Sequence, residues 1–129
     1  MNRITHFEIQ VDDAERAIKF YSDVFGWQFP KYMENYWGIV TAEKDSQEPG
    51  INGGLLLRPC PAPTMGQGTN AFVCTVQVDN FDEIAKKIEV AGGKVAMPKF
   101  AIMNMAWQGY FLDTEGNTFG VHQVDSNAK

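Results

Sequence analysis

The sequence lacks clustered positive charge. Its 129 residues include 11 Lys and Arg against 16 Asp and Glu, which gives a net charge of −5, and no basic run stands out. Nucleic-acid binding depends on clustered cations that neutralise phosphate groups. We therefore expect no nucleic-acid partner, although this charge balance still allows a small local anion site.

Cysteine is scarce, and long apolar runs are missing. Cys60 and Cys74 do not form a C-x-x-C pair, so the sequence has neither a zinc knuckle nor a redox pair. No apolar run approaches the roughly 20 residues that span a bilayer, and the opening MNRITHFEIQ lacks the apolar core of a signal peptide. We expect a cytoplasmic protein with no membrane partner and reduced thiols. The local alternation predicts that Cys74 is buried, while Cys60 falls in a loop.

An internal repeat organises what is present. The stretch 6–27, HFEIQVDDAERAIKFYSDVFGW, recurs without a gap at 73–94, VCTVQVDNFDEIAKKIEVAGGK, and both copies contain the tripeptide QVD. A gapless match with the same apolar period indicates an internal duplication. The composition, 44% hydrophobic and 21% charged, is near that of soluble globular proteins. We predict a single domain with module one at 1–58, a Pro- and Gly-rich linker at 59–70 and module two at 71–129.

Each half is predicted to form a strand, a helix and about three further strands. In the strand 4–11, Phe7, Ile9 and Val11 alternate with His6, Glu8 and Gln10, so the apolar and polar side chains point to opposite faces. The other elements expected in the first half are a helix from Asp12-Asp13 to a terminating Gly26, a strand pair or one long strand with a break within 27–41, and a strand at 53–58. Pro30 limits pairing within 27–41 to an edge or a bulge.

The second half repeats this order. Its expected elements are a strand at 71–78, a helix capped by Asp79 or Asn80 and ended by Gly92-Gly93, a short strand at 94–97 closed by Pro98, and a hairpin of 106–112 with 118–124. Apolar residues spaced three and four apart define the buried stripe of each helix. The stripes are Ala14, Ala17, Ile18, Tyr21, Val24 and Phe25, and Phe81, Ile84, Ala85, Ile88 and Ala91.

A duplicated βαβββ unit with these motifs resembles the vicinal oxygen chelate superfamily, the group of glyoxalase I, bleomycin-resistance proteins and extradiol dioxygenases. Three motifs carry the resemblance: the opening strand and FYSDVFGW helix, the VDNFDEIAKKIEVAGGKV helix, and the hairpin FLDTEGNTFGV. The resemblance implies an α+β fold in which two tandem βαβββ modules form a curved mixed sheet around a cavity. Thr114 departs from the proline usual in the family, which affects only turn stiffness.

The resemblance also implies where metal ligands would lie. Metal-dependent members take one ligand from the first strand and one from the last strand of each half. His6 fits the first of these positions, but the matching residues Val73 and Gly120 are not ligands, and 53–58, GGLLLR, offers neither an acid nor a histidine. The resemblance therefore extends to the fold and not to the metal chemistry, and we expect no cofactor.

Polar and aromatic residues remain as candidates for binding a small organic ligand. They are His6, Glu8, Gln10, Trp37, Thr75, Gln77, Trp107, Tyr110 and His122, with Tyr36 as a further aromatic neighbour. Most of them have a structural alternative. His6 can be an ordinary hydrogen-bonded residue, and His122 can be an end-of-strand residue near solvent. Glu8 can pair with His6 or Arg58, and the aromatic residues can belong to the core or to a dimer interface.

Three functional hypotheses follow. The first is a metal-independent binding protein of the bleomycin-resistance kind, holding a small organic molecule in the cavity. The second is a metal-dependent lyase, isomerase or dioxygenase that uses His6, Glu8 and His122 as a facial triad. The third is a non-catalytic regulatory or partner subunit. A homodimer is also expected, because each half leaves its first strand at the edge of a sheet. The methionine-rich stretch 97–107 is either a flap or a subunit contact.

Overall fold

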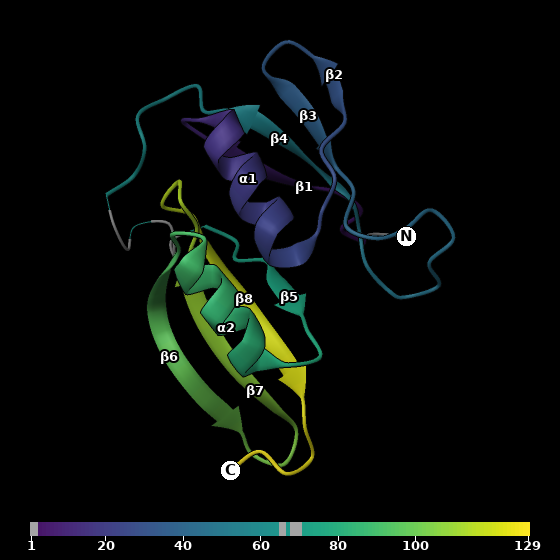
Figure 1. Ribbon diagram of the computed structural model, residues 1–129, viewed down its shortest axis with the longest axis vertical. Helices are drawn as coiled ribbons and strands as arrows, with labels where there is room; N and C mark the ends of the chain where they lie inside the picture. The colour runs from purple at the N-terminus through teal and green to yellow at the C-terminus, as the bar shows by residue number, and fades with distance from the viewer. Residues whose placement is uncertain (1–2, 65–66, 68–70) are drawn as a thin grey trace. The chain divides into compact units, whose positions relative to one another are not determined.

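The computed structural model describes residues 3–64, 67 and 71–129. It divides into two units, Met1–Ala62 and Pro63–Lys129, and each unit contains one βαβββ module (Figure 1). The division falls inside the segment 59–70 that the sequence marks as a linker. Residues 65–66 and 68–70 of that segment lie outside the described residues, so the extent of the linker stays a prediction.

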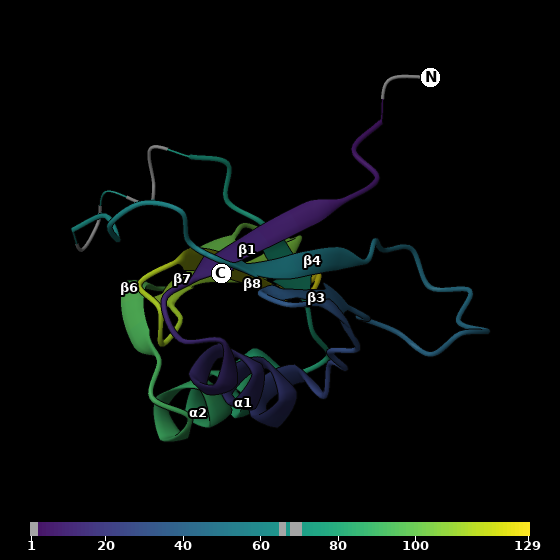
Figure 2. The same ribbon diagram turned by 90° about the horizontal axis from the view of Figure 1, so that it is seen from above.

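Module one contains a four-stranded mixed sheet and one helix. Its elements are β1 (Phe7–Val11), α1 (Ala14–Phe25), β2 (Lys31–Met33), β3 (Tyr36–Ile39) and β4 (Gly53–Leu57). The strand order is β1-β4-β3-β2, with β1 parallel to β4 and the other pairs antiparallel. The first strand is therefore an edge strand, as the sequence predicts. Figure 2 shows α1 along one face of this sheet.

The alternation in β1 determines which face meets the helix. Val11 is fully buried together with Leu55 and Ile39, and Phe7 and Ile9 pack against this cluster. The cluster includes Ala14 and Ala17 of α1, while Glu8 and Gln10 are exposed. Removing a side chain the size of Leu55 from water contributes about 1.5–3 kcal/mol. This face of the sheet is therefore fixed to α1, and the opposite, helix-distal face carries the polar residues.

The ends of α1 follow from two residues. The Asp13 carboxylate accepts a hydrogen bond from the Arg16 N–H at 3.1 Å, which caps the helix. Gly26 takes a positive φ of 72° and donates its N–H to the Ser22 carbonyl at 2.9 Å. Both caps are predicted correctly. The predicted buried stripe leaves out Phe20, whose side chain is only 1% exposed.

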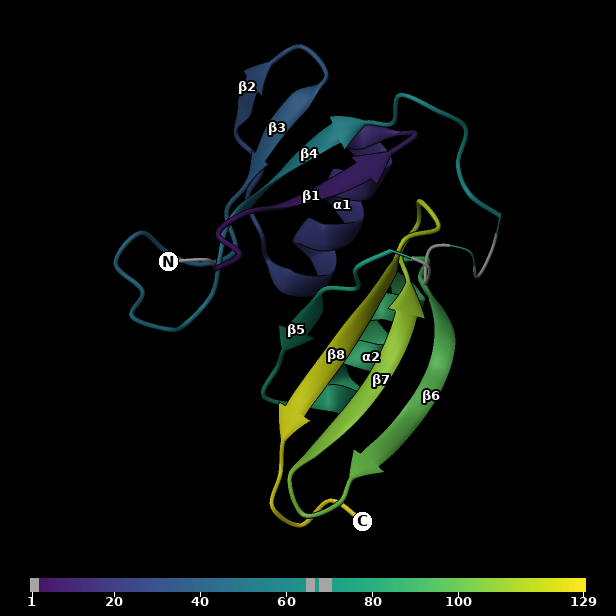
Figure 3. The same ribbon diagram turned by 180° about the vertical axis from the view of Figure 1, so that it is seen from behind.

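Module two repeats the architecture. Its elements are β5 (Thr75–Gln77), α2 (Phe81–Val90), β6 (Lys94–Ile102), β7 (Ala106–Leu112) and β8 (Thr118–Val124), in the sheet order β5-β8-β7-β6 with β5 parallel to β8. Asn80 caps α2 by accepting from the Glu83 N–H at 3.0 Å. The Phe81 ring of α2 lies 5.9 Å from the Phe111 ring, so this face of the sheet meets the helix. Figure 3 views the strands from the opposite face.

The prediction of a short strand at 94–97 is wrong. The strand β6 continues through Pro98 to Ile102, although its pairing with β7 shifts register between Val95 and Met97 and again between Met97 and Phe100. Proline lacks an N–H and is tolerated on edge strands and at bulges. Because β6 is an edge strand, Pro98 interrupts the ladder locally without ending it. The stretch 97–107 is therefore mostly strand and hairpin turn.

Two strands begin later than predicted, and the prediction for Cys74 is wrong. The strand β1 begins at Phe7 and not at Ile4, which is 78% exposed, and β5 begins at Thr75 and not at residue 71. Cys74 precedes β5, so the period of two does not govern its side chain, which is exposed. Cys60 is also exposed. None of the helices in the described part of the chain is long and apolar enough to cross a bilayer.

Candidate functional site

The helix-distal face of module one is built from residues that share a register. Glu8 is the Cα partner of Gly54, and Gly54 is the Cα partner of Gly38. The neighbouring partners Ile9 and Leu55 belong to the core on the helix side. Since successive strand residues alternate between faces, Glu8 and the two glycines lie on the helix-distal face.

Two tyrosines lean across this face over the two glycines. A Cβ at Gly54 would overlap the Tyr36 hydroxyl, and a Cβ at Gly38 would lie 2.7 Å from the Tyr32 Cε2. Each aromatic side chain therefore occupies the space that any larger residue would fill. Tyr32 is 66% exposed, so its ring is accessible. We call Tyr32 and Tyr36, with the glycines beneath them, the tyrosine shelf.

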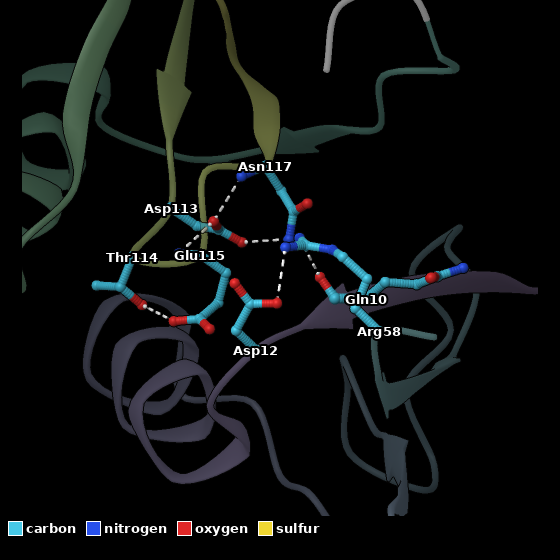
Figure 4. A network of polar contacts seen from close by, with 7 residues as sticks. All are labelled: Gln10, Asp12, Arg58, Asp113, Thr114, Glu115 and Asn117. Carbon is cyan, nitrogen blue, oxygen red and sulfur yellow. Dashed lines mark hydrogen bonds and ion pairs between the residues drawn. The ribbon is translucent and has the colours of Figure 1, made fainter. Parts of the chain in front are cut away.

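Glu8 pairs with His6 beside the tyrosine shelf. The His6 Nε2 lies 3.9 Å from the Glu8 Oε1, and the two side chains are 50% and 46% exposed. An exposed pair of this kind contributes only about 0–1 kcal/mol. Arg58, the other partner considered for Glu8, instead donates to the Asp12 carboxylate at 3.1 Å and to the Gln10 carbonyl at 2.9 Å (Figure 4).

Module two gathers a second group of polar residues on its helix-distal face. In the sheet, Gly120 is the Cα partner of both Thr75 and Tyr110. A Cβ at Gly120 would lie 2.5 Å from the Thr75 Oγ1, 2.9 Å from the Gln108 Nε2 and 3.2 Å from the Tyr110 Cε1. Three side chains, one from β5 and two from β7, therefore close over one glycine.

Gln108 is the residue of this group that the sequence interpretation missed. Its side chain carbonyl lies 2.8 Å from the His122 Nδ1, and the residue is only 5% exposed. A carbonyl oxygen only accepts, so Nδ1 donates and the neutral ring keeps Nε2 as an acceptor. His122 is in turn the Cα partner of Gln77. We call Thr75, Gln108, Tyr110 and His122 the module-two polar cluster. The predicted hairpin 106–112 with 118–124 could have revealed Gln108, because it faces His122 in that register.

The two tryptophans among the predicted site residues lie on the other face. Trp37 is the Cα partner of Leu55 and packs against the core of module one. Trp107 donates its indole N–H to the Asp125 carboxylate at 3.0 Å, and the Lys99 Nζ lies 4.5 Å from its ring and 5.4 Å from that of Phe81 in α2. The two tryptophans therefore do not line the helix-distal faces, where Tyr32, Tyr36 and Tyr110 lie.

A hydrogen-bonded turn links β7 to β8. The Asp113 carboxylate accepts from the backbone N–H groups of Glu115 and Asn117, each at 2.8 Å, and from the Asn117 side chain at 3.1 Å (Figure 4). Gly116 takes a positive φ of 80° in this turn. The motif FLDTEGNTFGV therefore holds β7 and β8 in register. This register places Gln108 of the polar cluster opposite His122.

The described part of the chain shows no cluster of metal-ligating side chains. Within residues 3–64, 67 and 71–129, no group of three His, Cys, Asp or Glu side chains could hold a metal ion. His6 and Glu8 form a pair within module one, while His122 belongs to module two. At the positions that the resemblance assigns to ligands, β4 carries only Gly and Leu, and β8 carries Gly120. The facial triad of His6, Glu8 and His122 stays a prediction.

Comparisons with known proteins agree with this architecture. The sequence profile of the Glyoxalase/Bleomycin resistance protein/Dioxygenase superfamily matches residues 3–121. A glyoxylase-like domain-containing protein of Didymella fabae is 30% identical over 125 residues, which cover 92% of this chain and 91% of that protein. CFP32 of Mycobacterium bovis, which is named as a candidate glyoxylase, is 26% identical over 123 residues, 92% of this chain and 44% of CFP32. This chain therefore spans less than half the length of that relative.

Solved structures show the same fold. The fosfomycin resistance protein FosX of Listeria monocytogenes superposes with a TM-score of 0.73 at 13% identity, covering 95% of this chain and 91% of that chain. A glyoxalase-related enzyme from Fulvimarina pelagi superposes with a TM-score of 0.69 at 16% identity, covering 95% and 88%. At these identities the likeness extends to the fold alone.

Proposed function

Because the chain belongs to the glyoxalase/bleomycin resistance protein/dioxygenase superfamily, we propose that it binds a small organic molecule without a metal ion. The module-two polar cluster is the proposed contact surface. One observation carries the proposal: Gln108 is 5% exposed, yet its amide and the His122 ring form a hydrogen-bonded pair on the helix-distal face. If this face of the sheet served only to pack against apolar residues, a buried hydrogen-bonded pair of polar side chains would not be expected on it.

The cluster suits an uncharged polar ligand. It offers the Thr75 hydroxyl, the Gln108 amide and the His122 ring beside the Tyr110 ring, and none of these groups is a fixed charge. Binding sites for small molecules combine aromatic walls with a few placed hydrogen-bonding groups. Gln77, which is the Cα partner of His122, adds a further amide at the edge strand. Carbonyl, hydroxyl and amide groups are the complementary chemistry.

A ligand screen followed by two matched variants tests the proposal. Thermal-shift screening of a library of small organic molecules should yield a ligand, and calorimetric titration should then give its dissociation constant. Gln108→Met keeps the shape of the side chain and removes its hydrogen bonds. We expect this variant to bind roughly tenfold more weakly, because one lost hydrogen bond costs about 1.4 kcal/mol or more. Gln47→Met in an exposed loop is the control and should bind like the wild type.

A metal-dependent reaction is the competing function, and the His6–Glu8 pair is the observation that favours it. Metal analysis of protein purified without a histidine tag separates the two functions. Under the binding-protein proposal, the purified protein contains less than one divalent metal ion per chain. Adding metal to the His6→Ala variant should not change its affinity for the ligand. A stoichiometric divalent ion that His6→Ala abolishes would overturn the proposal. If the wild type and Gln108→Met bound the ligand with equal affinity, the module-two polar cluster would not be part of the binding site.

A further inference from the structure

The tyrosine shelf of module one has a different chemistry from the module-two polar cluster. Within the described strands β1 to β4, the charged residues are Glu8 and Lys31. The Lys31 Nζ lies 5.4 Å from the Trp37 ring, and Trp37 packs against the core on the helix side. Glu8 therefore supplies the fixed charge that these strands place on the helix-distal face.

The tyrosine shelf lies in the same row of the sheet as Glu8. The Tyr36 hydroxyl lies over Gly54, and Gly54 is the Cα partner of Glu8 on the adjacent strand. Adjacent strands are about 4.8 Å apart, so the Gly54 backbone beneath the Tyr36 hydroxyl lies one strand spacing from the Glu8 backbone. The Tyr32 ring covers Gly38, which is the next Cα partner in the same row. Aromatic surface and negative charge thus follow one another along a single row of the sheet.

Glycine is required for this arrangement at both positions. Any Cβ at Gly54 or Gly38 would meet the end of a tyrosine side chain at less than contact distance. The two rings could then no longer lean over the neighbouring strand. An aromatic face attracts cations through its quadrupole, and a carboxylate within reach adds charge-assisted hydrogen bonding. The two features select the same kind of ligand.

We propose that the tyrosine shelf binds an organic cation with an apolar body. The positive group lies beside Glu8 and His6, and the apolar body lies against Tyr36 and Tyr32. The inference goes beyond the proposed function, because none of these residues belongs to module two and because it specifies the charge of the ligand.

A pair of planar probes that differ in charge tests the inference. The cation 9-aminoacridine and its uncharged parent acridine are titrated by fluorescence at mildly alkaline pH. We expect the wild type to bind 9-aminoacridine at least roughly tenfold more tightly than acridine. Glu8→Gln keeps the shape of the side chain and should remove this preference. Glu48→Gln changes an exposed carboxylate in a turn by the same chemistry and should retain it, which controls for the acidity of the whole protein.

Two further variants separate the aromatic contribution from the charge. Gly54→Ala forces the Tyr36 side chain off its position and should weaken 9-aminoacridine binding several-fold. Tyr36→Phe keeps the ring and should bind like the wild type. Should Gly54→Ala fail to fold, judged by circular dichroism, Tyr36→Ala provides the same comparison.

Three results would overturn the inference: equal affinity of the wild type for both probes, no binding of 9-aminoacridine, or an unchanged preference in Glu8→Gln. None of them bears on Gln108→Met, so the proposed function is judged separately.

Discussion

Asp113 stabilises the turn of the β7–β8 hairpin. Its carboxylate accepts three hydrogen bonds from Glu115 and Asn117, and the residue is 5% exposed. Asp113→Ala should lower the free energy of unfolding by about 3 kcal/mol, because the donors lose a charged acceptor in a buried place. Chemical denaturation beside the wild type measures this change. Asp45→Ala, at an exposed turn, is the control, and a loss below about 0.5 kcal/mol for Asp113→Ala would contradict the account.

Asp125 makes one local feature of module two sensitive to acid. Hydrogen bonds from the Asn127 backbone N–H and from the Trp107 indole lower the pKa of its carboxyl below the ordinary 3.8. A lowered pKa in the folded state means that the stabilising contribution is present above the ordinary value and is lost as the pH falls through the folded value. The Trp107 indole proton resonance in an NMR titration should therefore shift with a midpoint below 3.8. Asp125→Asn should abolish that shift, and a midpoint above the ordinary value would refute the assignment.

At the residue scale, sequence patterns placed polar groups on the correct face but did not identify their partners. The period of two correctly puts Glu8 and Gln10 opposite Ile9. It does not distinguish Gln108 from any other glutamine, because the burial of that residue depends on neighbours brought together by the sheet. The predicted roles of Trp37 and Trp107 as ligand contacts likewise rested on residue type, and both side chains lie on the helix side.

Among the elements, α1 depends on its terminal glycine. Gly26 takes a φ of 72°, and a Cβ there would meet nothing within 4 Å. The cost of Gly26→Ala is therefore conformational and should be about 1–2 kcal/mol in the free energy of unfolding. Gly50→Ala is the matched control, because it also meets nothing within 4 Å and its φ lies outside the left-handed region. Thermal or chemical denaturation compares the two variants, and equal stabilities would show that the helix end adapts freely.

Elements with strong local signals were predicted best. The hairpin 106–112 with 118–124 is confirmed to the residue, and both helices begin and end where their caps indicate. The extent of β6 was not predicted, because Pro98 ends a strand or passes through one according to whether that strand lies at an edge. Edge position is a property of the whole sheet and is absent from the local sequence.

At the scale of the molecule, we propose a homodimer. The first strands of the modules, β1 and β5, are edge strands of their own sheets, and an edge strand offers unpaired backbone groups for association. Sedimentation equilibrium at micromolar concentration should show a dimer. A monomer across that concentration range would refute the proposal.

The internal repeat, rather than any single residue, made the two-module architecture predictable. The identity of the ligand could not be predicted in this way, because it depends on a few side chains that differ between the two copies of the repeat, such as Glu8 and Thr75.

The parallel pairing of the first and last strands within each module has a consequence for biosynthesis. The strand β1 can complete its ladder only after β4 has been made, and β5 only after β8. The sheet of each module can therefore be completed only after the last strand of that module has been synthesised. Pairing between strands that are far apart in the sequence also slows folding. On the ribosome, module one obtains all its strands before module two is complete, so the two halves become competent to fold in order of synthesis. The duplication thus replaces one slow folding process over the whole chain with two shorter, successive ones, one for each module.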